Sequence, residues 1–265
     1  MRCRLLMVFL MLFSWHRHAS AESYQCVSFE YPPLISQLPG SAEPTGFAVE
    51  LVRRIFQQLG AEVTIQLFPW ERSMAKVRVG EADCIFTVYR SAERERFLDY
   101  SHELIIAQVI HFYARRNSAF SYNGDLSRLK GLRVGVVRQV NYGPKFEQAR
   151  SSLAVNEAAN VEQNFRKLAA GRVDVIPSNL ATAIATLGLP SLRDEAATIV
   201  QLSPPVEIVP SFVGFSKLRQ LDQLRDRFDA ALKKFAATAE YRQLLEKYQL
   251  GTAVELPRAA AAVAD

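Results

Sequence analysis

The sequence predicts an α/β protein with two lobes, each a mostly parallel sheet flanked by helices, joined by a two-segment hinge. First, strand-like and helix-like stretches alternate along the chain, which is typical of parallel sheets. Second, this alternation begins near residue 24 and begins again near residue 131. Third, two extended apolar stretches, 105–113 and 202–215, join the two units. Two such crossings between lobes form a hinge that can close around a ligand.

In the first unit, the pattern predicts a strand, a helix, a strand, a helix and a strand in turn. The strands are predicted over 24–29, 63–67 and 83–89, where apolar and β-branched residues gather. A shorter helix over 71–79 ends at a glycine. The first helix, over 47–59, is predicted from apolar residues at three- to four-residue spacing: Phe47, Leu51, Val52, Ile55, Phe56 and Leu59.

The second unit repeats this alternation. Strands are predicted over 131–137 and 173–176, and helices over 142–150 and 161–170. A single long helical stretch over 218–248 follows the second crossing. With 49% hydrophobic and 22% charged residues, the chain has the composition of a folded protein rather than a disordered one.

The first 21 residues carry the three parts of a secretory signal peptide. Arg2 and Arg4 form a basic start, residues 5–13 are an unbroken apolar run, and Ala19-Ser20-Ala21 is a small-residue cleavage site. The apolar run is too short to span a bilayer, which needs about 20 residues. We therefore expect residues 1–21 to be removed and the mature chain to be soluble and exported.

The charge of the mature chain argues against a nucleic-acid partner. The full sequence has a formal charge of +5, and the predicted signal peptide holds three arginines and no acid, which leaves +2. Phosphate binding requires clustered Lys and Arg rather than a small excess. The small-residue stretch 251–265 is expected to form a mobile tail.

Two cysteines, Cys26 and Cys84, remain after cleavage, and each lies in a strand-like run. The oxidising export compartment allows a disulfide between them, and two separate buried thiols are the slightly favoured alternative. No C-x-x-C motif is present, and His102 and His111 are the only histidines of the mature chain. We therefore predict no metal site.

Sequence signatures of catalysis are absent. The chain has no G-x-S-x-G, H-E-x-x-H or phosphate-binding loop, so we predict no catalytic residue and no cofactor. His102 and Glu103 are adjacent, and adjacent residues on an extended strand point to opposite faces. Glu30 and Glu207 are the two acids that an enzymatic alternative would use, although a carboxylate at the hinge surface is the simpler interpretation.

A series of short phrases resembles the periplasmic solute-binding proteins of amino-acid ABC transporters (bacterial extracellular solute-binding protein family 3). The phrases are YPP at 31–33, GFAVEL at 46–51, PWER at 69–72, GEAD at 80–83, SAER at 91–94, LDYS at 98–101, LKGLRVGV at 129–136 and GRVD at 171–174. Their order and spacing carry the resemblance over residues 24–250.

The resemblance implies the fold of a type II periplasmic binding protein. It implies a first lobe of residues 22–109 and 211–250 and a second lobe of residues 110–210. It also implies a monomer that captures a small-molecule ligand and delivers it to an ABC-transporter permease. A periplasmic enzyme on the same fold, dehydratase-like and acting on a cyclic carboxylic acid, is one alternative. An orphan or sensory binding protein is another.

In the first lobe, five residues are predicted to bind the ligand, and the resemblance implies three of them: Arg94, Thr87 and Tyr89. Arg94 stands where the family has the arginine that grips the ligand carboxylate, a task that suits a guanidinium fork. Thr87 and Tyr89 end a strand and share a face under the two-residue period. Tyr31 and Trp70 follow strands, where α/β sheets form ligand crevices.

In the second lobe, the sequence departs from the family pattern. The residues at the ligand positions are Asn141, Tyr142, Ser178 and Asn179. Asn179 replaces the aspartate that pairs with the ligand's α-ammonium group in the family, and an amide supplies no balancing charge. The resemblance implies a small carboxylate-bearing solute, an amino acid or a related polar molecule. The departure from the family pattern makes a carboxylate without an α-amine, or a larger polar solute, a serious candidate.

Overall fold

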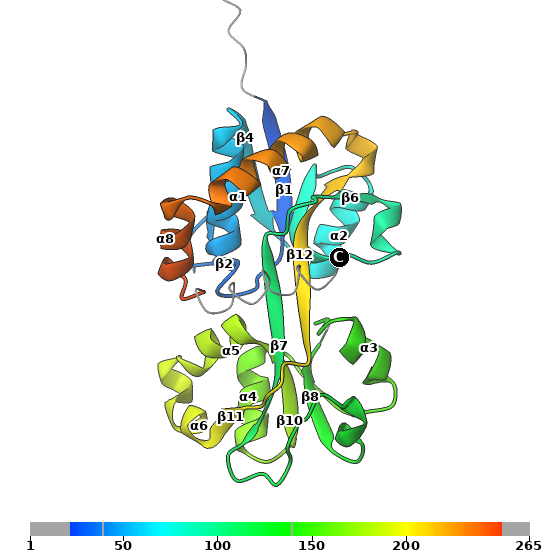
Figure 1. Cartoon of the computed structure of the whole chain (residues 1–265), viewed down its shortest axis with the longest axis vertical. Coiled ribbons are helices and arrows are strands. Elements are labelled where there is room, and N and C mark those ends of the chain that lie inside the picture. Colours follow the sequence, from blue (N-terminus) through cyan, green and yellow to red (C-terminus); the bar gives the residue numbers. More distant parts are fainter. Residues whose placement is uncertain (1–21, 39, 139, 251–265) are drawn as a thin grey trace, which may run out of the picture.

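Two ten-residue strands connect the two halves of the molecule in the computed structural model, which describes residues 22–250 except 39 and 139. They are β7 (Ile106–Arg115) and β12 (Glu207–Ser216), which lie side by side along the long axis (Figure 1). They pair antiparallel, with Ile110 opposite Glu207 and Ile106 opposite Ser211. The predicted α/β class with two crossing segments is confirmed. The predicted signal peptide and the predicted tail lie outside the described residues.

The upper half in Figure 1 contains a parallel core of three strands in the order β4-β1-β5, with β12 added antiparallel beside β5. Its strands and helices are β1 (Ser23–Ser28), β2 (Ser36–Gln37), β3 (Pro44–Thr45), α1 (Phe47–Gln58), β4 (Glu62–Leu67), α2 (Trp70–Arg78), β5 (Cys84–Tyr89), β6 (Leu98–Tyr100), α7 (Asp222–Ala236) and α8 (Ala239–Lys247).

The lower half continues the same sheet in the order β7-β10-β8-β9, with β8 parallel to both neighbours. Its elements are β8 (Arg133–Val137), α3 (Pro144–Arg150), β9 (Ala154–Ala158), α4 (Val161–Ala169), β10 (Val175–Asn179), α5 (Leu180–Leu187), α6 (Arg193–Thr198) and β11 (Ile199–Gln201). The sequence pattern predicted β8, α3, α4 and β10 but missed the other four.

The prediction of one helix over 218–248 is wrong, because the chain forms two helices there. Residues 217–219 make a single 3-10 turn, and Gln220 has a left-handed backbone conformation with φ of 52°. Helix α7 then ends at Ala236, and Thr238 begins a new helix because its side chain accepts a hydrogen bond from the Tyr241 N–H at 3.2 Å. The apolar spacing continues through this break, so periodicity alone does not reveal it.

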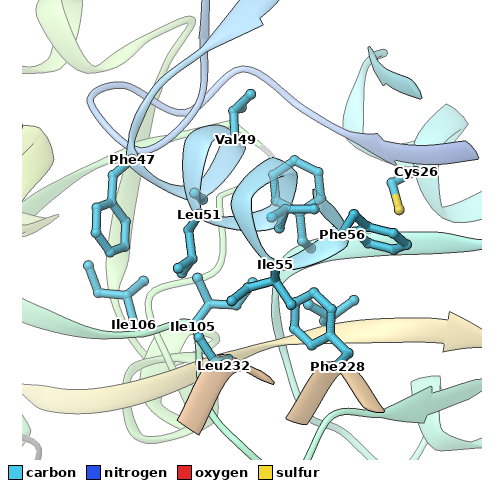
Figure 2. Packing of buried hydrophobic residues seen from close by; sticks show 14 of the residues in the cluster. Cys26, Phe47, Val49, Leu51, Ile55, Phe56, Ile105, Ile106, Phe228 and Leu232 are labelled. Atoms are coloured by element: carbon cyan, nitrogen blue, oxygen red, sulfur yellow. The ribbon is translucent and has the colours of Figure 1, made fainter. Parts of the chain in front are cut away.

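The core of the upper half lies between α1 and the strands and helices that cover it (Figure 2). Leu51 and Ile55 of α1 are fully buried. Phe228 and Leu232 of α7 pack in the same cluster. Burying a side chain of this size contributes about 1.5–3 kcal/mol, so α1 is held chiefly by this apolar face. No helix in the described part of the chain combines the length and apolar character of a membrane span.

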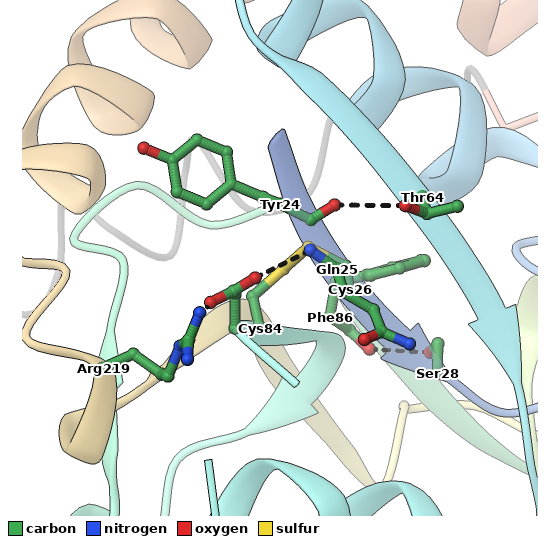
Figure 3. The surroundings of a disulfide bond; sticks show 9 residues. Tyr24, Gln25, Cys26, Ser28, Thr64, Cys84, Phe86 and Arg219 are labelled. Carbon is green, nitrogen blue, oxygen red and sulfur yellow. Dashed lines mark hydrogen bonds and ion pairs between the residues drawn. A yellow bond between two sulfur atoms is a disulfide. The ribbon is translucent and has the colours of Figure 1, made fainter. Parts of the chain in front are cut away.

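A disulfide joins Cys26 of β1 to Cys84 of β5 (Figure 3). The two residues are register partners on neighbouring parallel strands, with Cα atoms 4.5 Å apart. The carboxylate of Asp83, the residue before Cys84, accepts hydrogen bonds from the Gln25 N–H and from Arg219 Nε, both at 2.8 Å. The favoured interpretation of two separate thiols is therefore wrong. Sequence spacing could not show that β1 and β5 would be neighbours in this register.

Candidate ligand-binding site

A cavity of about 780 Å³ lies between the two halves. Residues 29–32, which follow β1, and residues 68–70, which follow β4, form its upper wall. The end of β8 and the junction between β10 and α5 form its lower wall. Parallel α/β sheets place ligand crevices at these carboxyl ends of strands, and the volume falls within the range of small-molecule sites, about 300–1,000 Å³.

Eight of the nine residues predicted to bind a ligand line this cavity: Tyr31, Trp70, Tyr89, Arg94, Asn141, Tyr142, Ser178 and Asn179. They come from both halves of the molecule and are brought together by the sheet and its β7–β12 crossing. Their part in binding stays a prediction, because lining a cavity does not demonstrate contact with a ligand.

Thr87 does not line the cavity, contrary to the prediction. It is the extra residue of a β-bulge, since β12 pairs Phe212 with Val88 and then Val213 with Phe86. Its φ is +66°, and its Oγ1 is enclosed without a hydrogen-bond partner among the described residues. A bulge breaks the two-residue alternation. The argument that placed Thr87 on the same face as Tyr89 therefore fails at this position.

Arg94 is held at the cavity by contacts that leave its charge unpaired. Its Nη1 donates to the Tyr89 carbonyl at 3.0 Å, and its guanidinium lies 4.8 Å from the Trp70 ring centroid. The neighbouring acids pair elsewhere, Glu93 with Arg78 and Glu95 with Arg90. No carboxylate of the described residues forms an ion pair with Arg94, so its guanidinium remains available to an anionic ligand.

Aromatic rings form the wall beside Arg94. The ring of Phe29 meets Trp70 edge to face at 4.9 Å between centroids and lies 5.7 Å from the ring of Tyr31. Trp70 is the first residue of α2 and is half-buried. Such a wall presents apolar surface to the uncharged part of a ligand, with the guanidinium at one edge.

Gln108 of β7 joins the two walls, and sequence reasoning missed it. Its side-chain oxygen accepts hydrogen bonds from the hydroxyls of Tyr31 at 2.9 Å and Tyr89 at 2.8 Å. It accepts a third, at 3.3 Å, from Nδ2 of Asn179. Burial raises the pKa of Tyr31 to about 12 and also raises that of Tyr89, so both hydroxyls remain protonated donors at neutral pH. A lone amide within the apolar run IIAQVI is the signal that could have identified it.

On the lower wall, Asn179 is the N-cap of α5. Its Oδ1 accepts hydrogen bonds from the backbone N–H groups of Ala181 at 2.9 Å and Thr182 at 3.3 Å. Tyr142 is fixed as well, because its hydroxyl accepts from the Val137 N–H at 2.8 Å. Asn141 accepts from the Gly143 N–H at 2.8 Å, so it forms a turn before α3 instead of capping the helix directly.

Two acids and two arginines are the charged residues among those that line the cavity: Glu30, Glu162, Arg94 and Arg138. Glu162 pairs with Arg166 at 2.9 Å, and Arg138 pairs with Glu157 at 3.4 Å. Glu207, the other acid considered for catalysis, is not among the lining residues, and its carboxylate accepts from the Lys145 N–H at 2.9 Å. Arg94 is therefore the lining cation without an acidic partner among the described residues.

The two halves also touch directly beside the cavity. Thr182 of α5 donates from Oγ1 to the Pro32 carbonyl at 3.1 Å. Ala181, next to it, is buried within the hydrophobic cluster of the upper half. These contacts hold the lower wall against the loop that follows β1, so the cavity is partly closed.

A separate cluster of His102, Asp226 and Asp229 brings metal-type ligand atoms within 4.8 Å of one another, away from the cavity. Asp229 is already engaged, because its carboxylate accepts from the backbone N–H groups of His102 at 2.9 Å and Glu103 at 3.0 Å. The His102 ring Nδ1 lies 2.9 Å from the same carboxylate. The cluster therefore fastens the turn at 102–103 to α7.

A cavity between two halves that hinge strands connect is the arrangement by which two-lobed solute-binding proteins enclose small molecules. The chain belongs to the bacterial extracellular solute-binding proteins, family 3, whose family model matches residues 25–252. This finding confirms the resemblance on which the site prediction was based.

The curated relative L-cystine-binding protein TcyJ of Escherichia coli (strain K12) is 27% identical over 147 residues. The match covers 55% of this chain and 54% of that protein, so the chain spans about half the length of the curated relative it matches. The similarity therefore supports family membership and leaves the ligand of this chain to be proposed.

Solved structures share the fold. The crystal structure of the substrate-binding protein of an amino acid ABC transporter is 21% identical with a TM-score of 0.66, covering 85% of this chain and 98% of that chain. A histidine kinase sensor domain with similarity to periplasmic binding proteins is 20% identical with a TM-score of 0.69, covering 86% and 96%. The predicted type II two-lobed fold is confirmed.

Proposed function

We propose that this chain is an exported periplasmic binding protein that captures a small carboxylate-bearing solute and delivers it to an ABC-transporter permease. It acts as a monomer, after removal of residues 1–21, and it binds its ligand without converting it. The observation that carries this proposal is the unpaired guanidinium of Arg94 at the edge of an aromatic-walled cavity between two halves. Membership of the solute-binding family supports it.

Arg94 gives the site its preference for anions. A guanidinium donates parallel charge-assisted hydrogen bonds to a carboxylate. Its contact with the Tyr89 carbonyl fixes the orientation of the fork, and the Trp70 ring holds its face. The rest of the ligand then lies along the aromatic wall of Phe29 and Trp70.

The hinge provides closure. We propose that residues 22–109 with 211–250 and residues 110–210 move as two lobes about the paired stretches of β7 and β12. In the open form a solute reaches the cavity, and in the closed form contacts such as Thr182 with Pro32 enclose it. Closure removes water from the charged contacts and thereby strengthens them.

Replacing Thr182 by valine is expected to shift the ligand-free protein toward the open form. Valine preserves the shape of threonine but leaves the Pro32 carbonyl without its donor. A lost hydrogen bond of this kind costs about 1 kcal/mol, or roughly a fivefold change in the open–closed equilibrium. Small-angle X-ray scattering should report a larger radius of gyration. Thr186→Val, on the same helix, should leave the radius of gyration unchanged. Equal radii for wild type, Thr182→Val and Thr186→Val would show that the hydrogen bond from Thr182 to Pro32 does not hold the closed form.

A thermal-shift screen of refolded residues 22–265 tests the proposed function. The panel contains α-amino acids, including L-cystine because a relative binds it, together with amine-free carboxylates and polyamines. A ligand at 100 times its dissociation constant stabilises the fold by about 2.7 kcal/mol, which raises Tm by about 5–10 °C for a chain of this size. The proposal predicts a shift with at least one carboxylate and none with polyamines. The absence of a thermal shift with every carboxylate in the panel would refute the proposal.

A further inference from the structure

The orientation of the Gln108 side chain follows from a chain of hydrogen bonds that starts at α5. The backbone N–H groups of Ala181 and Thr182 can only donate, so the atom of Asn179 that faces them is its oxygen. The Asn179 Nδ2 therefore points the other way, toward Gln108. Because Nδ2 also only donates, the atom of Gln108 that receives it is Oε1.

The oxygen of Gln108 is then fully occupied. It accepts from Tyr31, Tyr89 and Asn179, three donors for an atom with two lone pairs. Gln108 is only 2% exposed. Its oxygen has no capacity left for a ligand.

The nitrogen of Gln108 is in the opposite situation. Nε2 has no hydrogen-bond partner among the described residues, and it is not one of the fully enclosed polar atoms that lack one. Gln108 lines the cavity, and an amide nitrogen that is neither bonded nor fully enclosed has its two N–H donors available to an occupant there. An N–H donor without a protein partner bonds water when the cavity is empty, so an occupant that fills this position must supply an acceptor in its place.

The donor groups of the cavity lie at two separate points. Arg94 bonds the backbone carbonyl of Tyr89, whereas Gln108 bonds the hydroxyl at the far end of the same side chain. Asn179 stands where the family has the residue that pairs with the ligand's ammonium group. Its side-chain oxygen accepts from the first N–H groups of α5, so its side chain offers no acceptor to a ligand in the cavity. Of the two lining acids, Glu162 is paired with Arg166 and Glu30 is exposed.

We propose that Gln108 determines the class of ligand: its Nε2 donates to a carboxylate or carbonyl oxygen of the solute, so amine-free carboxylates bind more tightly than the corresponding α-amino acids. This inference rests on the proposed function and makes it specific. An α-ammonium group placed beside Gln108 would meet N–H donors instead of a balancing carboxylate. We expect the amine-free member of a matched pair to bind about 10- to 100-fold more tightly.

Matched pairs of probes test this inference by isothermal titration calorimetry. The pairs are 3,3′-dithiodipropionate with L-cystine, glutarate with L-glutamate, and 3-phenylpropionate with L-phenylalanine, which differ only in the α-ammonium groups. Wild-type protein is expected to favour the amine-free member of at least one pair tenfold or more. Binding of α-amino acids alone overturns this inference and leaves the proposed function intact. Absence of binding by every probe overturns the inference too.

The variant Gln108→Glu separates a ligand contact from a purely structural role. One carboxylate oxygen still accepts from Tyr31, Tyr89 and Asn179, while the other replaces the N–H donors by a negative acceptor. We expect the amine-free probe to lose about 100-fold in affinity and its α-amino partner to gain. Affinities within twofold of wild type for both probes would overturn the inference, because a structural role requires only the retained oxygen.

Two further variants control this experiment. Gln58→Glu makes the same change of charge at the exposed end of α1, outside the cavity lining, and should alter neither affinity. Gln108→Met removes the N–H donors without adding charge. If Gln108→Glu fails to fold, this variant tests whether the N–H donors contact the ligand. It should lose about tenfold for the amine-free probe. An unchanged affinity in Gln108→Met would overturn the inference.

Discussion

Replacing Arg94 by alanine is expected to lower the affinity for a carboxylate ligand by about 100-fold or more. Each hydrogen bond to a charged group contributes about 1.5–3 kcal/mol, and a guanidinium fork makes two of them with a carboxylate. Arg94 is the lining arginine without an acidic partner in the described part of the chain, so no other lining group replaces its unpaired charge. Calorimetry with the strongest ligand from the thermal-shift screen measures the loss.

Two variants control the Arg94 experiment. Arg94→Lys keeps the positive charge but removes the fork, and it should lose about tenfold because one directed hydrogen bond disappears. Arg96→Ala removes an exposed arginine from the same 3-10 turn, outside the cavity lining, and should bind like wild type. If the affinity of Arg94→Ala is within threefold of wild type, Arg94 does not hold the ligand carboxylate, even though the fold is as described.

Removing the disulfide is expected to lower the free energy of unfolding by about 4 kcal/mol. Cys26 and Cys84 are 58 residues apart in the sequence, so the bond closes a long loop in the unfolded chain. Loop-closure entropy for that length corresponds to about 4 kcal/mol, and Tm should fall by about 10 °C. The double variant Cys26→Ala, Cys84→Ala, measured by urea unfolding, provides the test.

Reduction of the disulfide measures its contribution to the free energy of unfolding independently. Wild-type protein in reductant should unfold at nearly the urea concentration of the double variant, and the variant itself should not respond to reductant. Because both cysteines are fully buried, an equilibrium measurement needs unfolding and refolding in reductant. A difference below 1 kcal/mol between oxidised and reduced wild type would contradict a stabilising role.

Much of the fold was predictable because long stretches with a regular apolar period indicate helices and strands directly. The apolar stripe of α1 and the strand-like runs of β1 and β5 lie where the sequence pattern predicts them. Helix α5 was missed because its run LATAIATL directly follows β10 without a turn residue. Its start depends on Asn179, which ends the strand and caps the helix at once.

The site was partly predictable because the family resemblance supplies positions such as Arg94 and Asn179. It could not supply Gln108, whose importance arises only where Tyr31, Tyr89 and Asn179 converge in space. The prediction that Thr87 shares the cavity face with Tyr89 fails for a related reason, since the bulge at Thr87 depends on how β5 pairs with β12. Contacts between strands that are distant in the sequence leave no periodic pattern in either one.

The measurement that tests the central claim most directly is a calorimetric titration of ligand-free residues 22–265 with the strongest ligand from the screen. The ligand is then recovered and examined by NMR. We expect saturation at one ligand per chain and recovery of the ligand chemically unchanged, as for a binding protein that encloses one solute between two lobes. A heat signal that does not saturate, or conversion of the ligand into a product, would contradict the account.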